Sequence, residues 1–87
     1  MSSQIAHLDK EHQDFLKTLG KNITEIRRQK RMSRLKLSEL SGLHTQYLLD
    51  VEAGRKNLGI YMIAQIARSL DIPLSELVQN IDLKPMK

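Results

Sequence analysis

The chain has 87 residues, of which 40% are hydrophobic and 28% are charged, and it contains no cysteine. A chain of this length buries only about 60 to 65% of its unfolded surface, which leaves little room for an enclosed substrate pocket and argues against an enzyme. Without cysteine no disulfide and no thiolate metal site can form, so we expect a reducing, cytoplasmic setting and no cofactor. No apolar stretch approaches the roughly 20 residues of a membrane span, and the N-terminus lacks the apolar run of a secretory signal.

The positive charge is concentrated in one part of the chain. The formal net charge is +4, but residues 15–36 contain eight Lys and Arg against Glu25 alone, a net +7, whereas residues 1–14 come to −2. Such a basic stretch is typical of an edge that faces a polyanion such as nucleic acid. A solvated helix face is the alternative interpretation of the same charges.

The spacing of apolar residues predicts helices throughout and no strand. The first helix is expected over about residues 13–31, because apolar side chains recur every three or four positions between Phe15 and Ile26. Gly20 lies inside this helix, where it costs about 1 kcal/mol relative to Ala. A close contact with another helix would explain its presence.

Two short helices are expected next. Ser33 is a suitable N-cap for a helix over residues 34–41, and Gly42 permits the chain to turn sharply directly after it. A third helix is expected over about residues 45–53, ended by Gly54.

The last two predicted helices follow a polar loop. Residues 60–70 have the clearest amphipathic pattern in the chain, and Asp71 and Pro73 should end that helix. A short fifth helix is expected over residues 74–80. Five helices and no strand predict an all-α fold.

The second and third predicted helices, joined by a tight turn, match the helix-turn-helix unit. The small side chain of Ser38 lets the two helices approach each other, and the angle between them is expected to be filled by Leu37, Leu43, Leu48 and Val51. The third helix would then project as a rod that fits the major groove of B-form DNA, which is about 12 Å wide.

At these residues the sequence resembles the lambda-repressor and Cro-like helix-turn-helix regulators, the XRE family. The matching segments are Ile26-Arg27-Arg28, Leu37-Ser38-Glu39, Gly42-Leu43, Tyr47-Leu48, Val51-Glu52-Ala53-Gly54-Arg55 and Ile66-Ala67-Arg68-Ser69-Leu70. The resemblance implies a five-helix lambda-repressor-like domain over residues 15–80, with an N-terminal extension over 1–14 and a tail over 81–87. The loop over residues 56–60 also resembles that of the controller proteins of restriction-modification systems.

The resemblance implies that the start of the third helix reads base pairs. The matching positions are His44, Thr45, Gln46, Leu49 and Asp50. Gln46 is the best candidate, because its amide can pair with adenine through two hydrogen bonds. Asp50 can accept from cytosine, but a carboxylate near phosphates is repelled unless it has a specific partner. A solvent-facing helix start is the alternative for these positions.

The resemblance also implies a set of contacts to the sugar-phosphate backbone. These would be made by Arg34, Lys36, Arg55, Lys56 and Asn57. Arg34 stands where the family commonly has Gln, and its guanidinium can replace the amide as a phosphate donor. Such contacts position a domain on DNA without reading its sequence.

Two further roles follow from the resemblance, an ion pair and a dimer contact. Arg27 and Glu52 match residues that pair between the first and third helices, the alternative being an exposed Glu52 without a partner. The family forms dimers through its last helix, where this chain has Leu74, Leu77, Val78, Ile81 and Leu83. We therefore expect a homodimer that binds a two-fold-symmetric operator in double-stranded DNA and acts as a repressor or autoregulator of transcription.

A second hypothesis is kept beside this one. Leu35, Leu40 and Leu49 stand where polar residues are more usual, and such a surface fits a protein partner, as in an antitoxin or another interaction module of the same fold. His7 and His12 do not predict a metal site, because a spacing of five residues places them poorly on one helix face and no third strong ligand is near.

Overall fold

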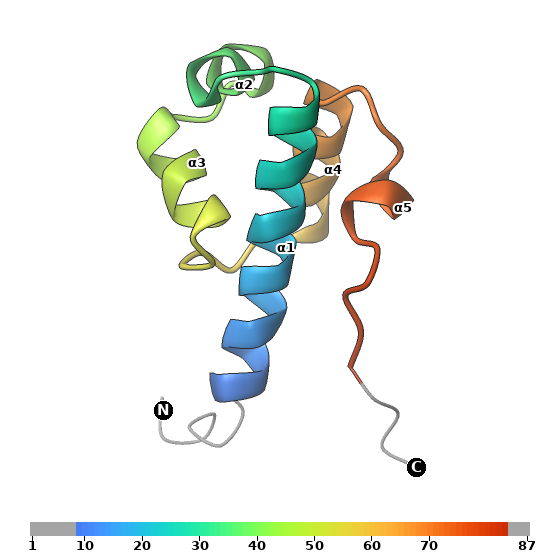
Figure 1. The fold of residues 1–87 in the computed structure, drawn as a ribbon. Helices are drawn as coiled ribbons and strands as arrows, with labels where there is room; N and C mark the ends of the chain where they lie inside the picture. Colours follow the sequence, from blue (N-terminus) through green and yellow to red (C-terminus); the bar gives the residue numbers. More distant parts are fainter. Residues whose placement is uncertain (1–8, 84–87) are drawn as a thin grey trace.

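The computed structural model describes residues 9–83 and contains, within them, five α-helices and no strand. The helices are α1 (Asp9–Gln29), α2 (Arg34–Ser41), α3 (Thr45–Glu52), α4 (Ile60–Ser69) and α5 (Leu74–Leu77). Figure 1 shows the long α1 in the middle, with α2 across its upper end, α3 on one side and α4 and α5 on the other. The predicted all-α, five-helix fold is confirmed.

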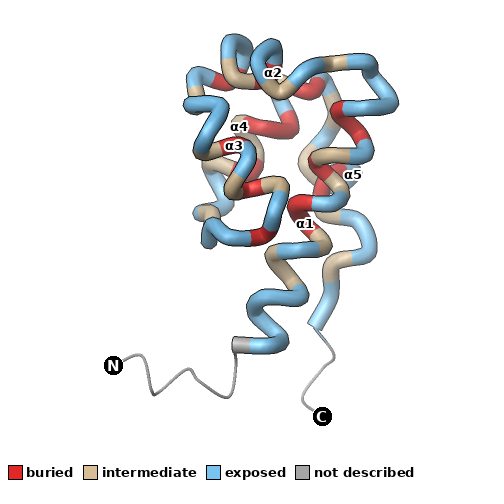
Figure 2. Tube along the Cα trace, turned by 60° about the vertical axis from the view of Figure 1, so that its left-hand side comes forward, coloured by how far each residue is buried: buried red, intermediate tan, exposed pale blue. Residues whose placement is uncertain are grey.

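The core is assembled from one face of every helix. Six large side chains, one from each of the five helices and one from the cap that follows α4, are fully buried, and they are Ile23, Leu37, Leu48, Ile66, Leu70 and Leu77. Buried positions follow the inward side of the chain trace in Figure 2, while the outer sides of α2 and α3 are exposed. Each such side chain contributes about 1.5 to 3 kcal/mol to folding, so the core fixes the arrangement of the helices.

Helix α1 begins earlier than the apolar pattern predicts, at Asp9 rather than near residue 13, and it ends at Gln29 rather than residue 31. Residues 9–14 contain no apolar side chain, so periodicity gives no signal there. The helix continues because each added residue gains a backbone hydrogen bond, and Lys10 and Asp14 pair at 3.6 Å across one turn. Arg31, with φ at 56°, takes the chain out of helical geometry.

Helix α2 has the predicted limits because both of its end signals are local. The Ser33 hydroxyl accepts a hydrogen bond from the backbone N–H of Lys36 at 2.9 Å. Gly42 follows the helix with φ at 79°, in the left-handed region that residues with a Cβ rarely adopt. The short turn to α3 depends on this glycine.

Gly20 is explained by a close approach between α1 and the end of α3. A Cβ at this position would lie 2.4 Å from the carbonyl oxygen of Glu52 and 2.5 Å from that of Val51. No side chain fits between the two backbones there. The predicted close helix contact is confirmed.

Helix α5 ends at Leu77, three residues before the predicted end at Asn80. The Asn22 side chain of α1 donates hydrogen bonds to the carbonyl oxygens of Leu77 and Gln79, both at 2.9 Å. A continued helix would need the first of these acceptors for its own backbone, and Asn80 has φ at 64°. The prediction was too long because a tertiary contact, rather than a sequence breaker, ends this helix.

Candidate nucleic-acid interface

Helix α3 is held by one face and open on the other. Leu48 and Val51 are buried and Tyr47 packs against the core from the edge. Thr45 and Gln46 are exposed on the opposite side. The helix is therefore presented with its N-terminal residues outward, as a major groove reader requires.

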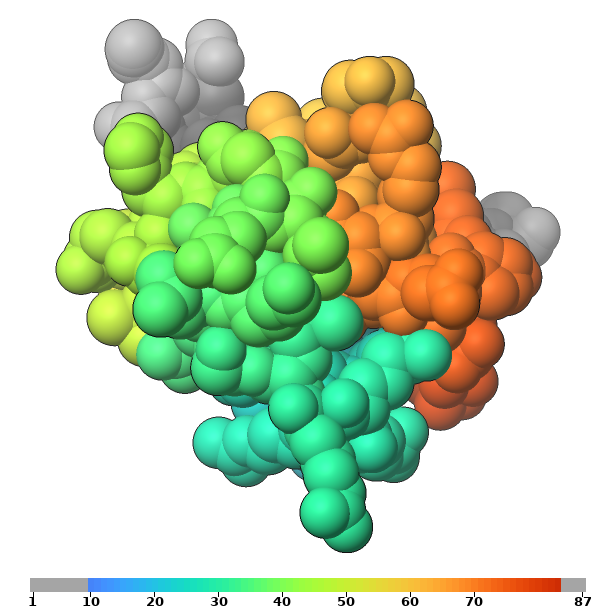
Figure 3. Space-filling view, turned by 90° about the horizontal axis from the view of Figure 1, so that it is seen from above, coloured from blue at the N-terminus to red at the C-terminus, as the bar shows by residue number. Residues whose placement is uncertain are grey.

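The turn before α3 is fixed by hydroxyl groups. The Ser38 hydroxyl donates to the carbonyl oxygen of Leu43, and the backbone N–H of Leu43 donates to the Ser41 hydroxyl at 3.2 Å. His44 is the N-cap residue of α3, without a capping hydrogen bond from its side chain. In Figure 3 the outer surface of α2 lies beside that of α3, so the two helices share one side of the molecule.

The predicted ion pair between α1 and α3 is present and nearly buried. Arg27 Nε donates to Glu52 Oε2 at 2.7 Å and Arg27 Nη2 donates to Glu52 Oε1 at 3.1 Å. The side chains are 9% and 5% exposed, respectively. Arg27 Nη1 also donates to the carbonyl oxygen of Met32 at 2.9 Å. The pair therefore connects α3 to the end of α1 and to the turn between α1 and α2.

Arg34 joins this pair, which the sequence alone did not indicate. Its Nε and Nη2 atoms both lie 3.1 Å from Glu52 Oε1, so one carboxylate holds α1, α2 and α3 together. Burial raises the pKa of Glu52, but the hydrogen bonds and charges of Arg27 and Arg34 together outweigh it and hold the pKa below its ordinary value. Arg34, predicted to bind phosphate, is engaged by Glu52 with 35% of its side chain exposed.

A second network lies on the outer side of α3. Asp50 Oδ1 accepts hydrogen bonds from Arg55 Nη2 at 2.8 Å, from Arg55 Nε at 3.3 Å and from Gln46 Nε2 at 3.4 Å. The hydrogen bond from Arg55 is the main cause that lowers the pKa of Asp50. Asp50, predicted to contact a base, therefore has partners within its own chain, and no sequence signal distinguished this role from base contact.

Four of the predicted phosphate-binding residues are exposed on α2 or in the loop after α3. They are Lys36, Arg55, Lys56 and Asn57. The Lys56 ammonium lies 5.7 Å from the centre of the Tyr47 ring, a distance at which a cation and an aromatic face attract each other. The loop after α3 therefore places cations next to the exposed residues of α3, and Leu49, 38% exposed, lies on the same helix.

The residues predicted to form the dimer contact fall into different environments. Leu77 is fully buried in the core of its own chain, so its predicted place in an interface is wrong. Leu74, Val78 and Ile81 are half-buried against the same core, and Leu83 is 56% exposed. The largest exposed apolar side chains at the start of α4, Ile60 and Tyr61 at 67% and 72%, were not singled out from sequence.

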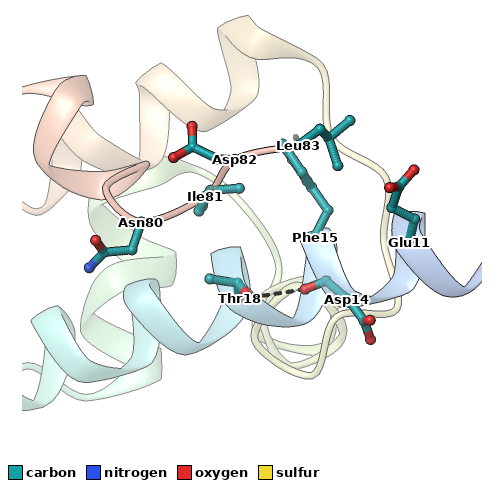
Figure 4. A pocket seen from close by; sticks show the side chains of 8 residues that line it. All are labelled: Glu11, Asp14, Phe15, Thr18, Asn80, Ile81, Asp82 and Leu83. Atoms are coloured by element: carbon teal, nitrogen blue, oxygen red, sulfur yellow. Dashed lines mark hydrogen bonds between the residues drawn. The ribbon is translucent and has the colours of Figure 1, made fainter. Parts of the chain in front are cut away.

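An open groove of about 280 Å³ lies between the first turns of α1 and the segment after α5. Figure 4 shows Phe15, Ile81 and Leu83 on its apolar side and the carboxylates of Glu11 and Asp82 at its edge. Acidic side chains repel phosphates, so the lining of this groove does not favour binding of nucleic acid.

Within residues 9–83, no group of three or more His, Cys, Asp and Glu side chains is arranged to hold a metal ion. His7 lies outside the described residues. None of the described helices combines the length and the apolar character needed to cross a membrane.

The fold, the turn and the exposed α3 define a helix-turn-helix DNA-binding domain, and comparison with known proteins agrees. The helix-turn-helix family model (HTH_3) matches residues 23–77. An uncharacterised HTH-type transcriptional regulator of Sinorhizobium fredii, y4dJ, is 32% identical over 72 residues, which cover 83% of this chain and 94% of that protein. The control protein C.SmaI of Serratia marcescens is 28% identical over 71 residues, covering 82% and 84% of the two chains.

A solved structure shows the same likeness. The restriction-modification controller protein C.AhdI of Aeromonas hydrophila superposes with a TM-score of 0.69 and 37% identity, over 71% of this chain and 94% of that one. The chain belongs to the helix-turn-helix family of DNA-binding transcription regulators, and restriction-modification controller proteins are among its relatives.

Proposed function

We propose that this regulator is sequence-specific and binds a two-fold-symmetric operator in double-stranded DNA as a homodimer, repressing transcription or regulating its own gene. The observation that carries the proposal is the position of α3. Its N-terminal residues are exposed, and exposed basic side chains stand on α2 and in the loop that follows α3, which is what a groove reader needs.

Base recognition is assigned to Thr45, Gln46 and Leu49, with His44 at the edge of the contact. Gln46 offers both an acceptor and a donor, the pair of groups that adenine requires, and Thr45 and Leu49 offer apolar contact to a thymine methyl group. Phosphate contacts are assigned to the basic and amide side chains around the helix, which are Arg34, Lys36, Arg55, Lys56 and Asn57. These contacts supply affinity and register, while α3 supplies selectivity.

A dimer is proposed because one domain of this size contacts too few base pairs for tight, specific binding. Two copies that pair about a two-fold axis contact two half-sites about one helical turn apart, which doubles the number of base pairs that the protein reads. Leu83, supported by Leu74, Val78 and Ile81, is one candidate contact surface. Ile60 and Tyr61 form the other, and their greater exposure favours them.

Selection of bound fragments from the source genome tests the proposal. Purified protein is mixed with sheared genomic DNA at a low and a high salt concentration, and the retained fragments are sequenced. We expect a shared palindrome with half-sites about one helical turn apart, retained at both salt concentrations. Recovery of random fragments that disappear at high salt would contradict a sequence-specific regulator.

One observation favours a second function. Leu35 and Leu40 on α2 are 60% and 49% exposed, an apolar surface that a DNA-binding role does not need. An antitoxin or another interaction module would cover this surface with a protein partner and use the basic side only for weak DNA binding. Failure of the genomic selection would move the search to this surface.

A cytoplasmic location and independence of cofactors stay predictions.

A further inference from the structure

The carboxylate of Asp50 connects the best candidate for base recognition with a candidate phosphate contact. Its Oδ1 atom accepts from Arg55 Nη2 at 2.8 Å and from Gln46 Nε2 at 3.4 Å. The backbone N–H of Arg55 donates to the carbonyl oxygen of Asp50, also at 2.8 Å. Arg55 is therefore held to Asp50 through both its backbone and its side chain, in the absence of DNA.

This contact favours one orientation of the Gln46 amide over the other. A carboxylate accepts hydrogen bonds and repels another oxygen, so only the nitrogen end of the amide can face Asp50. One of the two Nε2 hydrogens is used by Asp50. The carbonyl oxygen and the second hydrogen remain for a partner outside the protein.

The groups that remain on Gln46 are the two that adenine requires in the major groove. Adenine presents a donor at N6 and an acceptor at N7, which pair with an amide oxygen and an amide hydrogen. A reversed amide would exchange these groups and lose the match. Fixing the amide before binding also reduces the rotamer freedom that would otherwise be lost in the complex.

The same carboxylate orients Arg55. Its Nε and Nη2 atoms are on Asp50, which leaves Nη1 for a phosphate, and its side chain is 59% exposed. Asp50 itself has a side chain that is 21% exposed. Since its negative charge lies among groups assigned to phosphates, Asp50 should weaken the attraction to any DNA while it improves selectivity.

We propose that Asp50 is a positioning residue for DNA recognition: it does not contact DNA, but sets the Gln46 amide to read adenine and joins it to the phosphate contact of Arg55. This inference rests on the proposed function, because it concerns the same operator-reading surface. It replaces the expectation that Asp50 itself reads a cytosine.

The test compares Asp50→Asn and Asp50→Ala with the parent protein. Affinity is measured for the selected operator, for operators with each base pair replaced in turn, and for random DNA. We expect both variants to bind random DNA about two- to fivefold more tightly, because a negative charge next to the assigned phosphate contact of Arg55 is lost. Discrimination at one A·T pair should fall about tenfold, the size of one lost base-reading pair.

Two controls separate positioning from charge. Glu39→Gln removes one exposed negative charge from α2, away from this network, and should increase affinity for random DNA without changing discrimination. In a Gln46→Ala background, Asp50→Asn should no longer alter discrimination at that A·T pair, because the amide it positions is absent. Undiminished discrimination in both Asp50 variants would overturn the inference. So would a loss at a G·C pair that persists without Gln46, since Asp50 would then read a cytosine directly.

A measurement on the free protein gives an independent readout. The side-chain amide resonances of Gln46 should shift in Asp50→Asn and Asp50→Ala, and stay in place in Glu39→Gln. Unchanged resonances in the Asp50 variants would show that the contact does not form, which overturns the inference. A parent protein that prefers no operator would instead contradict the proposed function, before any variant is compared.

Discussion

At the scale of single residues, Glu52 is the position on which the presentation of α3 depends most. Its carboxylate is almost wholly buried and bonds to Arg27 of α1 and Arg34 of α2. Within the described residues, no buried side-chain nitrogen or oxygen lacks a hydrogen-bond partner. A buried charge network of this kind lowers the stability of the fold little while it is complete, and lowers it strongly when one member is removed.

Removal of the two members of the pair should therefore have unequal effects. Glu52→Leu leaves the buried Arg27 without a counterion and should lower the free energy of unfolding by about 3 to 5 kcal/mol. Arg27→Met should cost less, because Arg34 still neutralises Glu52. Urea unfolding followed by circular dichroism measures both. The control is Asp14→Ala, which breaks an exposed pair and should cost under about 0.5 kcal/mol. Equal losses in the first two variants would argue against a role for Arg34.

Stability should also fall in acid because of Glu52. The pKa of this group is lower in the folded protein than its ordinary value of 4.5, so its ionised form stabilises the fold. That contribution is fully present above the unfolded pKa and is lost as the pH falls through the folded pKa. When unfolding is measured from pH 7 to pH 3, the free energy of unfolding of the parent protein should fall below about pH 4.5. The fall should be smaller in Glu52→Gln. Parallel curves for the two proteins would contradict this assignment.

At the scale of elements, local signals predicted α2 well and the ends of α1 and α5 poorly. Ser33 and Gly42 act through the nearest backbone groups, so a sequence pattern contains them. The start of α1 lies among polar residues, where apolar periodicity is silent. The end of α5 depends on Asn22, 55 residues away, and no local pattern contains that contact.

In the candidate site, too, some features were predicted from the sequence and others depend on contacts that only the fold creates. The pair between Arg27 and Glu52 was predicted from the resemblance and is confirmed. The hydrogen bonds from Arg34 to Glu52 and from Arg55 to Asp50 were not predicted, because they depend on side chains that the fold brings together. Leu77 was misassigned because an apolar residue looks the same in sequence whether it faces its own core or a partner.

The approach of α1 to the end of α3 gives a prediction at this scale. Gly20→Ala should lower the free energy of unfolding by about 1 to 3 kcal/mol, since the two backbones must separate to admit a methyl group. The control is Gly59→Ser, because nothing lies within 4 Å of a Cβ there and Ser is a good N-cap for α4. Thermal or urea unfolding of both variants measures the change in the free energy of unfolding. An unchanged free energy of unfolding in Gly20→Ala would mean that the backbones of α1 and α3 leave room for a methyl group at this position.

At the scale of the whole molecule, the two assigned kinds of DNA contact should respond differently to mutation. Gln46→Ala should weaken operator binding by about 1 to 3 kcal/mol and relax the choice of one base pair. Lys36→Ala should weaken operator and random DNA alike and lower the salt slope by about one. Titrations at several salt concentrations measure both quantities. If Gln46→Ala weakened all DNA equally, α3 would not be the reading helix.

The two candidate dimer surfaces can be separated with one charge each. Tyr61→Lys alters the exposed start of α4, and Leu83→Lys alters the segment after α5. We expect Tyr61→Lys to shift the protein toward the monomer in sedimentation equilibrium and Leu83→Lys to change it little, since the more exposed apolar surface benefits most from being covered. The reverse result would place the contact at the end of the chain, as the sequence predicted.

The junction at Glu52 also bears on how such a regulator can acquire new targets. Because α1, α2 and α3 meet at a single carboxylate, α3 is anchored on its inner side, and its outward positions take no part in that anchoring. Exchanges at Thr45, Gln46 and Leu49 therefore leave the scaffold intact. On the proposed function, new operator preferences can arise there one residue at a time, while the domain keeps its stability through each step of divergence.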